Sequence, residues 1–374
     1  MAGQGAKVRR QEDNTDGPCG PDDGECAEGY CCSEEGWCGL GYEYCWSPQC
    51  QFEYGSGCDT WDVPSGETTE NVERAKIGSV FYGGAGIYSC TNPGVIALTY
   101  DDGPDQYTEH VLDVLAEYDA KATFFVCGNN NGKGEIDDDE YPWGDVLRRM
   151  YDEGHQIASH TWSHEDLSAV TAEMRHDQMI YNEIALVNVL GVFPTYMRPP
   201  YSSCTAESGC ESDMADLGYH VVYFDLDTDD YDNTTPETIQ NAKDNFDNSV
   251  LDSSAAEDDW LVISHDIHEQ TAYNLTAYML ETLLAQGFQP VTVGECLGDP
   301  AENWYRDPDA PAPAEPSNAP QQPDNVSQDA SCGEDAGWTC ESSMWGDCCS
   351  QHGWCGSTFD YCGTGCQPDF GTCL

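Results

Sequence analysis

Short apolar runs alternate with amphipathic stretches through the middle of the chain. Seven runs have the length of a buried strand, and they cover 95–100, 121–126, 156–160, 195–198, 219–225, 260–265 and 289–293. Most are separated by stretches in which apolar residues recur every three or four positions, as at 111–118 and 278–284, which predicts helices. Strands that alternate with helices are typical of a parallel α/β sheet. We expect an incomplete, distorted (β/α)7 barrel rather than an open doubly wound sheet.

Four glycines support these boundaries. Gly154, Gly191, Gly218 and Gly287 each lie where a helical stretch gives way to the next strand. A helix commonly ends in a residue with left-handed backbone angles, which glycine adopts without steric cost. In either form of sheet, ligands bind at the C-terminal ends of the strands, so the residues that follow the strands are the first candidates for a site.

Two adjacent carboxylates, Asp101 and Asp102, follow the run 95–100 and enter a Gly-Pro turn. By itself the sequence Asp-Asp-Gly-Pro is most often only a turn. Charges at the end of a buried strand, however, need a cation, a proton or a hydrogen-bond donor. Later strand ends supply such partners, and the set together favours a functional site: His160, His164, Arg198 and His265.

Two of these residues suggest a metal site. His160 and His164 are four positions apart, which places both imidazoles on one side if the segment turns helically. Thr161 stands where a zincin motif would have its Glu, so we expect the third ligand from another strand, with Asp102 as the candidate. Two His and one carboxylate suit Zn2+ first and other divalent metals such as Co2+ second. The alternative is a pair of structural histidines.

The positions of the cysteines divide the chain of 374 residues into three parts. Eight of its 21 cysteines lie within 19–58 and eight within 332–373. We therefore expect two small disulfide-rich modules around one central domain. The predicted boundaries are 17–58 for the first module, 59–86 for a polar linker, 87–300 for the central domain, 301–331 for a Pro-rich linker and 332–374 for the last module.

The same cysteine density is typical of an oxidising compartment. Sequences of the form Asn-X-Ser/Thr at Asn233, Asn274 and Asn325 fit a secreted glycoprotein. Neither a signal peptide nor a membrane span is visible, and we take the export signal to have been removed or replaced. The predicted location is extracellular or in a cell wall.

Acidic residues outnumber basic ones by 69 to 13, and the formal net charge is -56. A charge of this size argues against nucleic acid or an anionic membrane as a partner. It leaves two interpretations open: a solubilising surface, or a surface that attracts a cationic polymer. We expect the protein to be a monomer.

Both terminal modules contain adjacent cysteines followed by a Ser-x-x-Gly-Trp-Cys segment, at 33–38 and 350–355. In this they resemble the hevein-type chitin-binding module. Spacing alone leaves 105 pairings open in each module. The resemblance implies eight disulfides: Cys19–Cys32, Cys26–Cys38, Cys31–Cys45, Cys50–Cys58, Cys332–Cys349, Cys340–Cys355, Cys348–Cys362 and Cys366–Cys373.

The resemblance also implies a shallow site for N-acetylglucosamine in each module, made by Ser33, Trp37 and Tyr44 and by Ser350, Trp354 and Tyr361. Flat aromatic rings cover the apolar face of a sugar, and the hydroxyl hydrogen-bonds to it. Glu35 and His352 stand where the family usually has another aromatic residue. Weak binding, or a purely structural copy, therefore remains an alternative.

The central domain resembles the polysaccharide deacetylase family, also called the NodB-homology or carbohydrate esterase 4 family, from about Tyr88 to Cys296. The motifs that carry the resemblance are Thr-Tyr-Asp-Asp-Gly-Pro at 99–104, His-Thr-Trp-Ser-His at 160–164, Arg-Pro-Pro-Tyr at 198–201, Asp-Thr-Asp-Asp-Tyr at 227–231 and Ile-Ser-His at 263–265. The resemblance implies a distorted (β/α) barrel that removes acetyl groups from polymeric sugars.

Roles follow from the same resemblance. It implies that Asp101 is the general base, oriented by Arg198, and that His265 is the general acid, oriented by Asp230. It implies the metal ligands Asp102, His160 and His164, and an oxyanion donor in the backbone N–H of Tyr201. Tyr231 and Ile263 replace the family's usual Trp and Leu and keep an apolar wall for the acetyl methyl group.

Five cysteines lie in the central domain. Their positions suggest the pairs Cys90–Cys296, which would join the two ends of the barrel, and Cys204–Cys210, which would close the loop after Tyr201. Cys127 is then the odd thiol, and we expect it to be a small buried residue rather than a reactive group.

Together these observations predict a secreted, metal-dependent chitin deacetylase that converts chitin and chitooligosaccharides to chitosan and acetate. An acetylxylan esterase is one alternative, and the two modules that resemble chitin-binding proteins argue against it. A catalytically inactive chitin-binding lectin is the other, and the complete set of expected catalytic positions argues against that.

Overall fold

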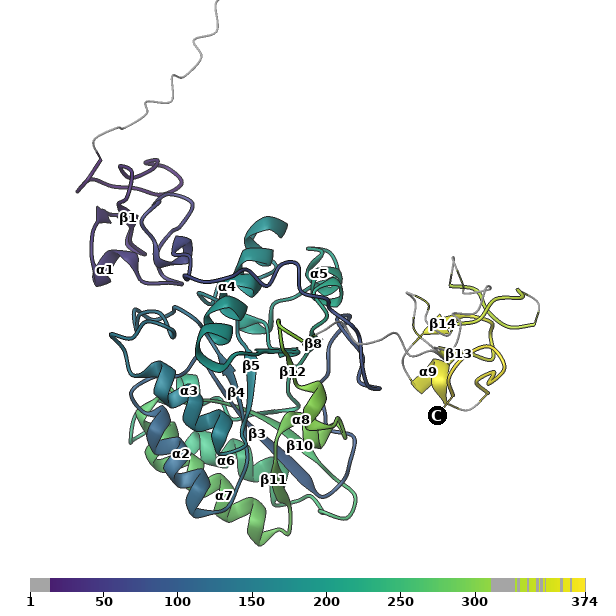
Figure 1. Cartoon of the computed structure of the whole chain (residues 1–374). Helices are drawn as coiled ribbons and strands as arrows, with labels where there is room; N and C mark the ends of the chain where they lie inside the picture. The colour runs from purple at the N-terminus through teal and green to yellow at the C-terminus, as the bar shows by residue number, and fades with distance from the viewer. Residues whose placement is uncertain are drawn as a thin grey trace, which may run out of the picture. The chain divides into compact units, whose positions relative to one another are not determined.

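The computed structural model describes residues 14–310, 327 and, within 330–373, all residues except 335, 341–342, 344–345, 347, 357–358 and 364. The chain divides into two compact units after Ala310. The first unit contains the N-terminal module and the central domain, and the second contains the C-terminal module (Figure 1). Asn325, the third predicted glycosylation site, lies outside the described residues.

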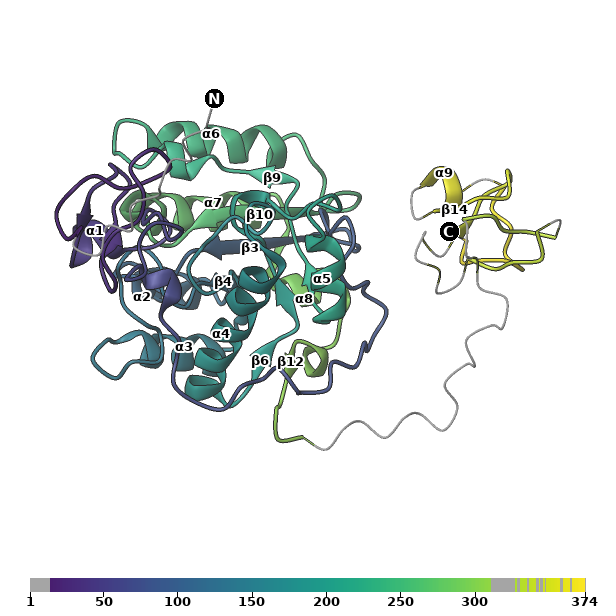
Figure 2. The same ribbon diagram turned by 90° about the horizontal axis from the view of Figure 1, so that it is seen from above.

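The central domain is built on a curved parallel sheet. Its strands follow the order β8-β7-β5-β4-β3-β10-β9, and β11 pairs with the first half of β3. Figure 2 shows β3 between β4 and β10. The strands are β3 (Val95–Asp101), β4 (Thr123–Val126), β5 (Gln156–Ser159), β7 (Tyr196–Met197), β8 (His220–Val221), β9 (Leu226–Asp227), β10 (Trp260–His265) and β11 (Gln289–Val291).

All seven predicted strands are present, and the incomplete barrel is confirmed. The sheet also contains β9, a strand of two residues that the sequence pattern did not separate from the preceding apolar run. β3 is buried on both faces. Ile96, Leu98 and Tyr100 belong to one hydrophobic cluster, whereas Ala97 between them belongs to another. This burial explains why the strand reads as a continuous apolar run.

Helices cover the outside of the sheet (Figure 1). The longer ones are α2 (Thr108–Glu117), α3 (Trp143–Asp152), α4 (Ala172–Leu190), α5 (Cys210–Asp216), α6 (Ile239–Val250) and α7 (Thr276–Ala285). The short helices are η1 (Asp59–Trp61), η2 (Pro200–Ser202), η3 (Asp230–Asp232), η4 (Thr271–Leu275), α8 (Val293–Cys296) and η5 (Ala301–Asn303). The predicted helices at 111–118 and 278–284 correspond to α2 and α7. The four glycines predicted to end helices all have positive φ angles, between 69° and 88°.

The segments on either side of the central domain pack against it. Beyond the predicted boundary at residue 300, β12 (Tyr305–Arg306) pairs antiparallel with β6 (Phe193–Pro194). In the predicted linker 59–86, Arg74 forms a 2.7 Å ion pair with the buried Glu183 of α4. Thr69 of the same linker also donates a hydrogen bond to Glu183, so polar contacts attach this segment to the domain.

Each terminal module consists of a small antiparallel pair of strands and a one-turn helix. The elements are β1 (Cys31–Cys32), β2 (Cys38–Gly39) and α1 (Tyr42–Cys45) in the first module, and β13 (Cys348–Cys349), β14 (Cys355–Gly356) and α9 (Phe359–Cys362) in the last. The ten disulfides are the same pairs that the sequence suggested: eight in the modules, Cys90–Cys296 and Cys204–Cys210. Cys127 is a free, buried thiol, as expected.

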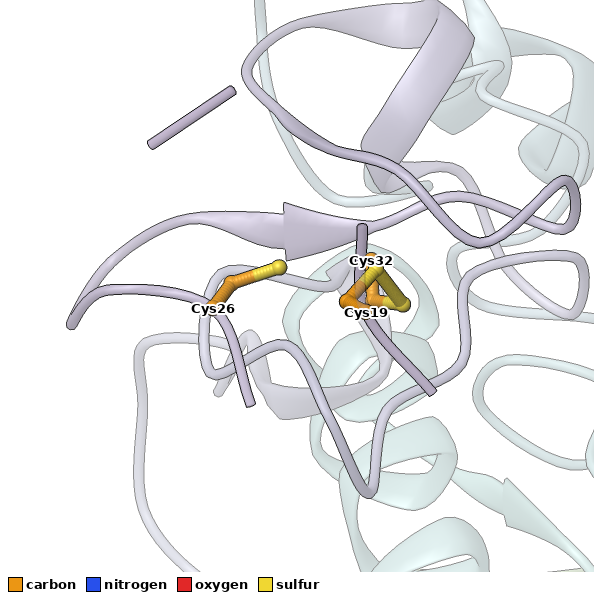
Figure 3. A group of neighbouring side chains, drawn as sticks. All are labelled: Cys19, Cys26 and Cys32. Carbon is orange, nitrogen blue, oxygen red and sulfur yellow. A yellow bond between two sulfur atoms is a disulfide. The ribbon is translucent and has the colours of Figure 1, made fainter. Parts of the chain in front are cut away.

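Three sulfur atoms of the first module lie close together, those of Cys19, Cys26 and Cys32. Figure 3 shows the bond between Cys19 and Cys32, and Cys26 is bonded to Cys38. Because all three sulfurs are in disulfides, none is a thiolate that could bind a metal ion. Among the described residues, no helix has both the length and the apolar character needed to cross a membrane.

Candidate active site

A cavity of about 540 Å3 lies at the C-terminal ends of the central strands. This volume is typical of a small-molecule site. Nine of the predicted site residues line it: Asp101, Asp102, His160, His164, Arg198, Tyr201, Tyr231, Ile263 and His265. Pro48, Gln49, Asn131, Phe224 and His268 also line it, and sequence reasoning had not assigned them to the site.

Asp101 ends β3 and is only 1% exposed. Its Oδ1 atom accepts a 2.8 Å hydrogen bond from Nη1 of Arg198. The Arg198 guanidinium also donates to Thr99 Oγ1 and to two backbone carbonyl groups, and it stacks on the ring of Phe125 at 4.2 Å. These contacts fix the guanidinium, which in turn holds Asp101 through Oδ1, while Oδ2 of Asp101 lies 3.8 Å from Nε2 of His160.

Asp102, His160 and His164 converge on one point. Oδ1 of Asp102 lies 3.1 Å from Nε2 of His164 and 3.4 Å from Nε2 of His160. One potential ligand atom from each of the three residues lies within 4.8 Å of the others. The predicted helical turn at 160–164 is wrong, because the segment is not helical. Thr161 and His164 instead have left-handed φ angles, 73° and 62°, and these bring both imidazoles to one side.

Two observations test whether these residues fit a divalent metal. Nδ1 of His160 lies 2.7 Å from the backbone oxygen of Arg198, which fixes this nitrogen as the donor and leaves Nε2 with its lone pair toward Asp102. Oδ1 of Asp102 is buried and has no hydrogen-bond partner within the described part of the chain. A cation between the three side chains would satisfy this oxygen, so the donor set fits a zinc-type site.

The electrostatics of Asp102 agree with this fit. Burial opposes its ionisation, but the charge of His164 is the largest opposing effect, and the balance holds the pKa of Asp102 well below its ordinary value. The carboxylate is therefore ionised at neutral pH. Asn130 and Lys133 both donate to its backbone oxygen, at 3.2 and 3.0 Å, and so fix the loop that carries it. No motif in the sequence had pointed to either residue.

His265 lies beside Asp101 in the sheet, since the two residues are paired in the register of β10 and β3. Its Nδ1 is 2.7 Å from Oδ1 of the fully buried Asp230, whose Oδ2 accepts from the His265 backbone N–H and from the Thr271 hydroxyl. Burial lowers the pKa of His265, but Asp230 more than compensates and raises it to about 10. His265 is therefore a protonated imidazole at neutral pH.

Aromatic and apolar side chains complete the cavity. The ring of Tyr231 lies edge-on to His265, with centroids 5.4 Å apart, and its hydroxyl donates to Asp227. The ring of Tyr201 lies edge-on to His164 at 4.7 Å, and Tyr201 itself has a left-handed φ of 57°. With Ile263 these residues surround the polar centre with apolar surface.

The two modules present their predicted sugar-binding residues in the same local arrangement. Trp37 and Trp354 are 51% and 53% exposed. Their backbone N–H groups donate to the hydroxyls of Ser33 and Ser350, at 3.4 and 3.3 Å. In each module a tyrosine, Tyr44 or Tyr361, packs on a glycine of the second strand. In the C-terminal module a cavity of about 450 Å3 lies beside Trp354 and His352.

Known proteins resemble the central domain and the C-terminal module. The family model for polysaccharide deacetylases matches residues 88–222, and that for chitin recognition proteins matches residues 331–373. The chain is 45% identical to a chitin deacetylase of Colletotrichum lindemuthianum over 223 residues, which are 60% of this chain and 87% of that protein. It is 41% identical to a chitin deacetylase of a Pestalotiopsis species over 287 residues, 77% of this chain and 89% of the relative.

The solved structure of the chitin deacetylase from the fungal pathogen Colletotrichum lindemuthianum is also similar. It superimposes with a TM-score of 0.57 at 44% sequence identity, over 60% of this chain and 96% of that one.

Proposed function

The chain belongs to the polysaccharide deacetylase family, and from this premise we propose that it is a metal-dependent chitin deacetylase. It hydrolyses the N-acetyl groups of chitin and chitooligosaccharides to give chitosan and acetate. One observation carries the proposal. A carboxylate held by an arginine, a two-His, one-Asp cluster and a protonated histidine all line a single cavity.

In the proposed reaction, water adds to the acetyl carbonyl carbon and the bond from this carbon to the sugar nitrogen breaks. Asp102, His160 and His164 would hold the metal, and Zn2+ is the ion that these ligands suit best. When bound, such an ion lowers the pKa of water and polarises a carbonyl group.

The protein's own residues move the protons. Asp101 takes a proton from the attacking water, and Arg198 keeps its carboxylate aimed at that point. The backbone N–H of Tyr201 donates to the negative charge that develops on the carbonyl oxygen. His265 gives a proton to the sugar nitrogen, which then leaves as an amine. Tyr231 and Ile263 enclose the acetyl methyl group.

The chitin specificity is supported by the C-terminal module, which matches chitin recognition proteins, and by the names of the relatives. We further propose that the protein is secreted and glycosylated and acts as a monomer. Ten disulfides in the described chain support an oxidising extracellular location. Nucleic acid and membranes are not proposed as partners, given the net charge of -56.

The decisive experiment measures acetate released from chitin oligomers and from acetylated xylan, with and without a chelator. A chitin deacetylase releases acetate from the oligomers, and the chelator stops it. Faster release from acetylated xylan would identify an acetylxylan esterase. No release from either substrate, with chitin still bound, would identify a lectin.

If the module tryptophans bind the polymer, replacing Trp37 and Trp354 by Ala will lower activity on solid chitin by about 3- to 10-fold, because the modules raise the local substrate concentration. Activity on short soluble oligomers should not change, since neither tryptophan lines the catalytic cavity. Acetate release on both substrates is the measurement. An equal loss on both would contradict the proposed role.

The pH dependence should reveal the partnership of Asp230 and His265. His265 must be protonated to act as an acid, so activity is lost as pH rises through its pKa, about 10 in the wild type. Replacing Asp230 by Asn removes the charge that raises this pKa. The alkaline limb of the kcat profile should then move toward lower pH, in the direction of the ordinary histidine value of about 6.5.

The matched control for this change is Thr271→Val. It also removes a hydrogen bond to Asp230 but leaves the carboxylate beside His265. Its alkaline limb should stay close to that of the wild type. An unshifted limb in Asp230→Asn would show that another group acts as the acid.

A further inference from the structure

One wall of the catalytic cavity comes from the N-terminal module. Pro48 and Gln49, which follow helix α1 of that module, line the cavity next to Asn131 of the central domain. Both side chains are half-buried. A residue of a separate module therefore faces the same space as the catalytic histidines.

The module is attached at this point by backbone and side-chain contacts. The N–H of Asn131 donates to the backbone oxygen of Ser47 at 2.7 Å. The ring of Tyr42 packs on Gly132, where a Cβ atom would lie 2.2 Å from it and where φ is +63°. Both space and backbone angle thus require glycine at position 132.

A second contact runs to the metal-binding segment. The hydroxyl groups of Ser47 and Thr60 are hydrogen-bonded at 2.5 Å, and Thr60 donates to Oε1 of Glu165 at 2.6 Å. Ser47, Thr60 and Glu165 are all buried. Glu165 directly follows His164, so the loop 47–49 is fixed relative to the site by a chain of satisfied polar groups.

The attachment leaves the predicted sugar-binding face of the module accessible. Trp37 is 51% exposed, whereas the contacts with the domain involve the edge formed by Tyr42, Ser47 and the segment after it. The predicted sugar site of the module therefore does not include the loop 47–49. The position of this loop at the catalytic cavity is a separate feature.

We propose that Pro48 and Gln49 form a binding subsite for a sugar unit beyond the immediate neighbour of the one that reacts, where a dimer does not reach, so that the N-terminal module helps to set the preferred chain length. The inference rests on the proposed chitin deacetylase function. The proline ring offers apolar surface to the face of a sugar. The Gln49 amide lies beside the Glu34 carboxylate, so the amide orientation that satisfies both groups places its nitrogen 3.1 Å from Glu34 Oε2 as the donor. In that orientation its oxygen accepts from a hydroxyl or acetamide N–H of an N-acetylglucosamine unit.

The test replaces Gln49 by Ala in the full-length protein and compares kcat and KM on chitin oligomers of two to six units. Loss of one hydrogen bond should raise KM about 3- to 10-fold on the longer oligomers. The kcat, and the KM on the dimer, should stay within about twofold of the wild type. Glu28→Ala is the matched control, because Glu28 is exposed on the same module and is not part of the cavity wall.

A second variant guards against loss of folding. Gln49→Met keeps most of the volume but cannot hydrogen-bond, and it should give the same rise in KM. The inference is overturned if both variants show the oligomer profile of Glu28→Ala, or if KM rises equally on dimer and hexamer. An inactive wild type would instead contradict the proposed function, so the two failures are distinguishable.

Discussion

Asp101→Asn is expected to keep the bound metal and to lose turnover, whereas Asp102→Ala is expected to lose the metal. The two residues are adjacent in sequence, but Asp101 contacts Arg198 and Asp102 faces the two histidines. Asn has the size of Asp and can still accept hydrogen bonds, but it cannot take a proton from water at neutral pH. Loss of a general base lowers kcat by about 100- to 10,000-fold.

Metal content after dialysis and acetate release from chitin oligomers are the two measurements for these variants. Asp105→Asn is a suitable control, since Asp105 lies in the same loop but does not line the cavity. It should resemble the wild type in both measurements. Normal metal content in Asp102→Ala, or a metal-free Asp101→Asn, would show that the two roles are exchanged.

The second large effect is expected for His265→Ala, which should retain its metal and lose about 100- to 10,000-fold in kcat on N-acetyl substrates. An amine leaves poorly from an amide unless its nitrogen is protonated. His265 is held by Asp230 on the side away from the cavity and is protonated at neutral pH. His160 and His164 also line the cavity, but they face Asp102 in the proposed metal cluster.

An activated acetyl ester serves as the internal control for this variant. Its leaving group departs without a proton, so His265→Ala should act on it at a rate much closer to that of the wild type. Rates of acetate release from the ester and from a chitin oligomer give the comparison. Equal losses on the two substrates would mean that His265 does not act as the acid.

Site residues were easiest to predict where a polar or charged residue stands at the C-terminal end of an apolar run. Asp101 follows an apolar run and His160 and His265 each end one, and parallel strands bring their C-terminal ends to one edge. The convergence of these residues is therefore predictable from the amino-acid pattern alone. The geometry of the two histidines is not, because it depends on left-handed angles at Thr161 and His164 that no periodicity indicates.

Contacts between the N-terminal module and the central domain could not be predicted from the sequence either. Gln49 lies 52 positions before Asp101 along the chain, and nothing in its neighbourhood is typical of a catalytic site. Lys133 and Asn130 support the Asp102 loop from a polar segment without a motif. β9 has only two residues and follows an acidic position, so it carries no alternating or apolar pattern of its own.

The disulfide between Cys90 and Cys296 has a consequence for resistance to proteolysis. It joins residues 206 positions apart, so nearly the whole catalytic barrel lies inside one covalent ring. A loop of this size removes on the order of 5 kcal/mol of conformational freedom from the unfolded chain in the chain-entropy model. A single cut in any surface loop between the two cysteines opens the ring but separates no fragment. A nicked molecule would therefore keep every catalytic strand tethered until the disulfide itself is reduced.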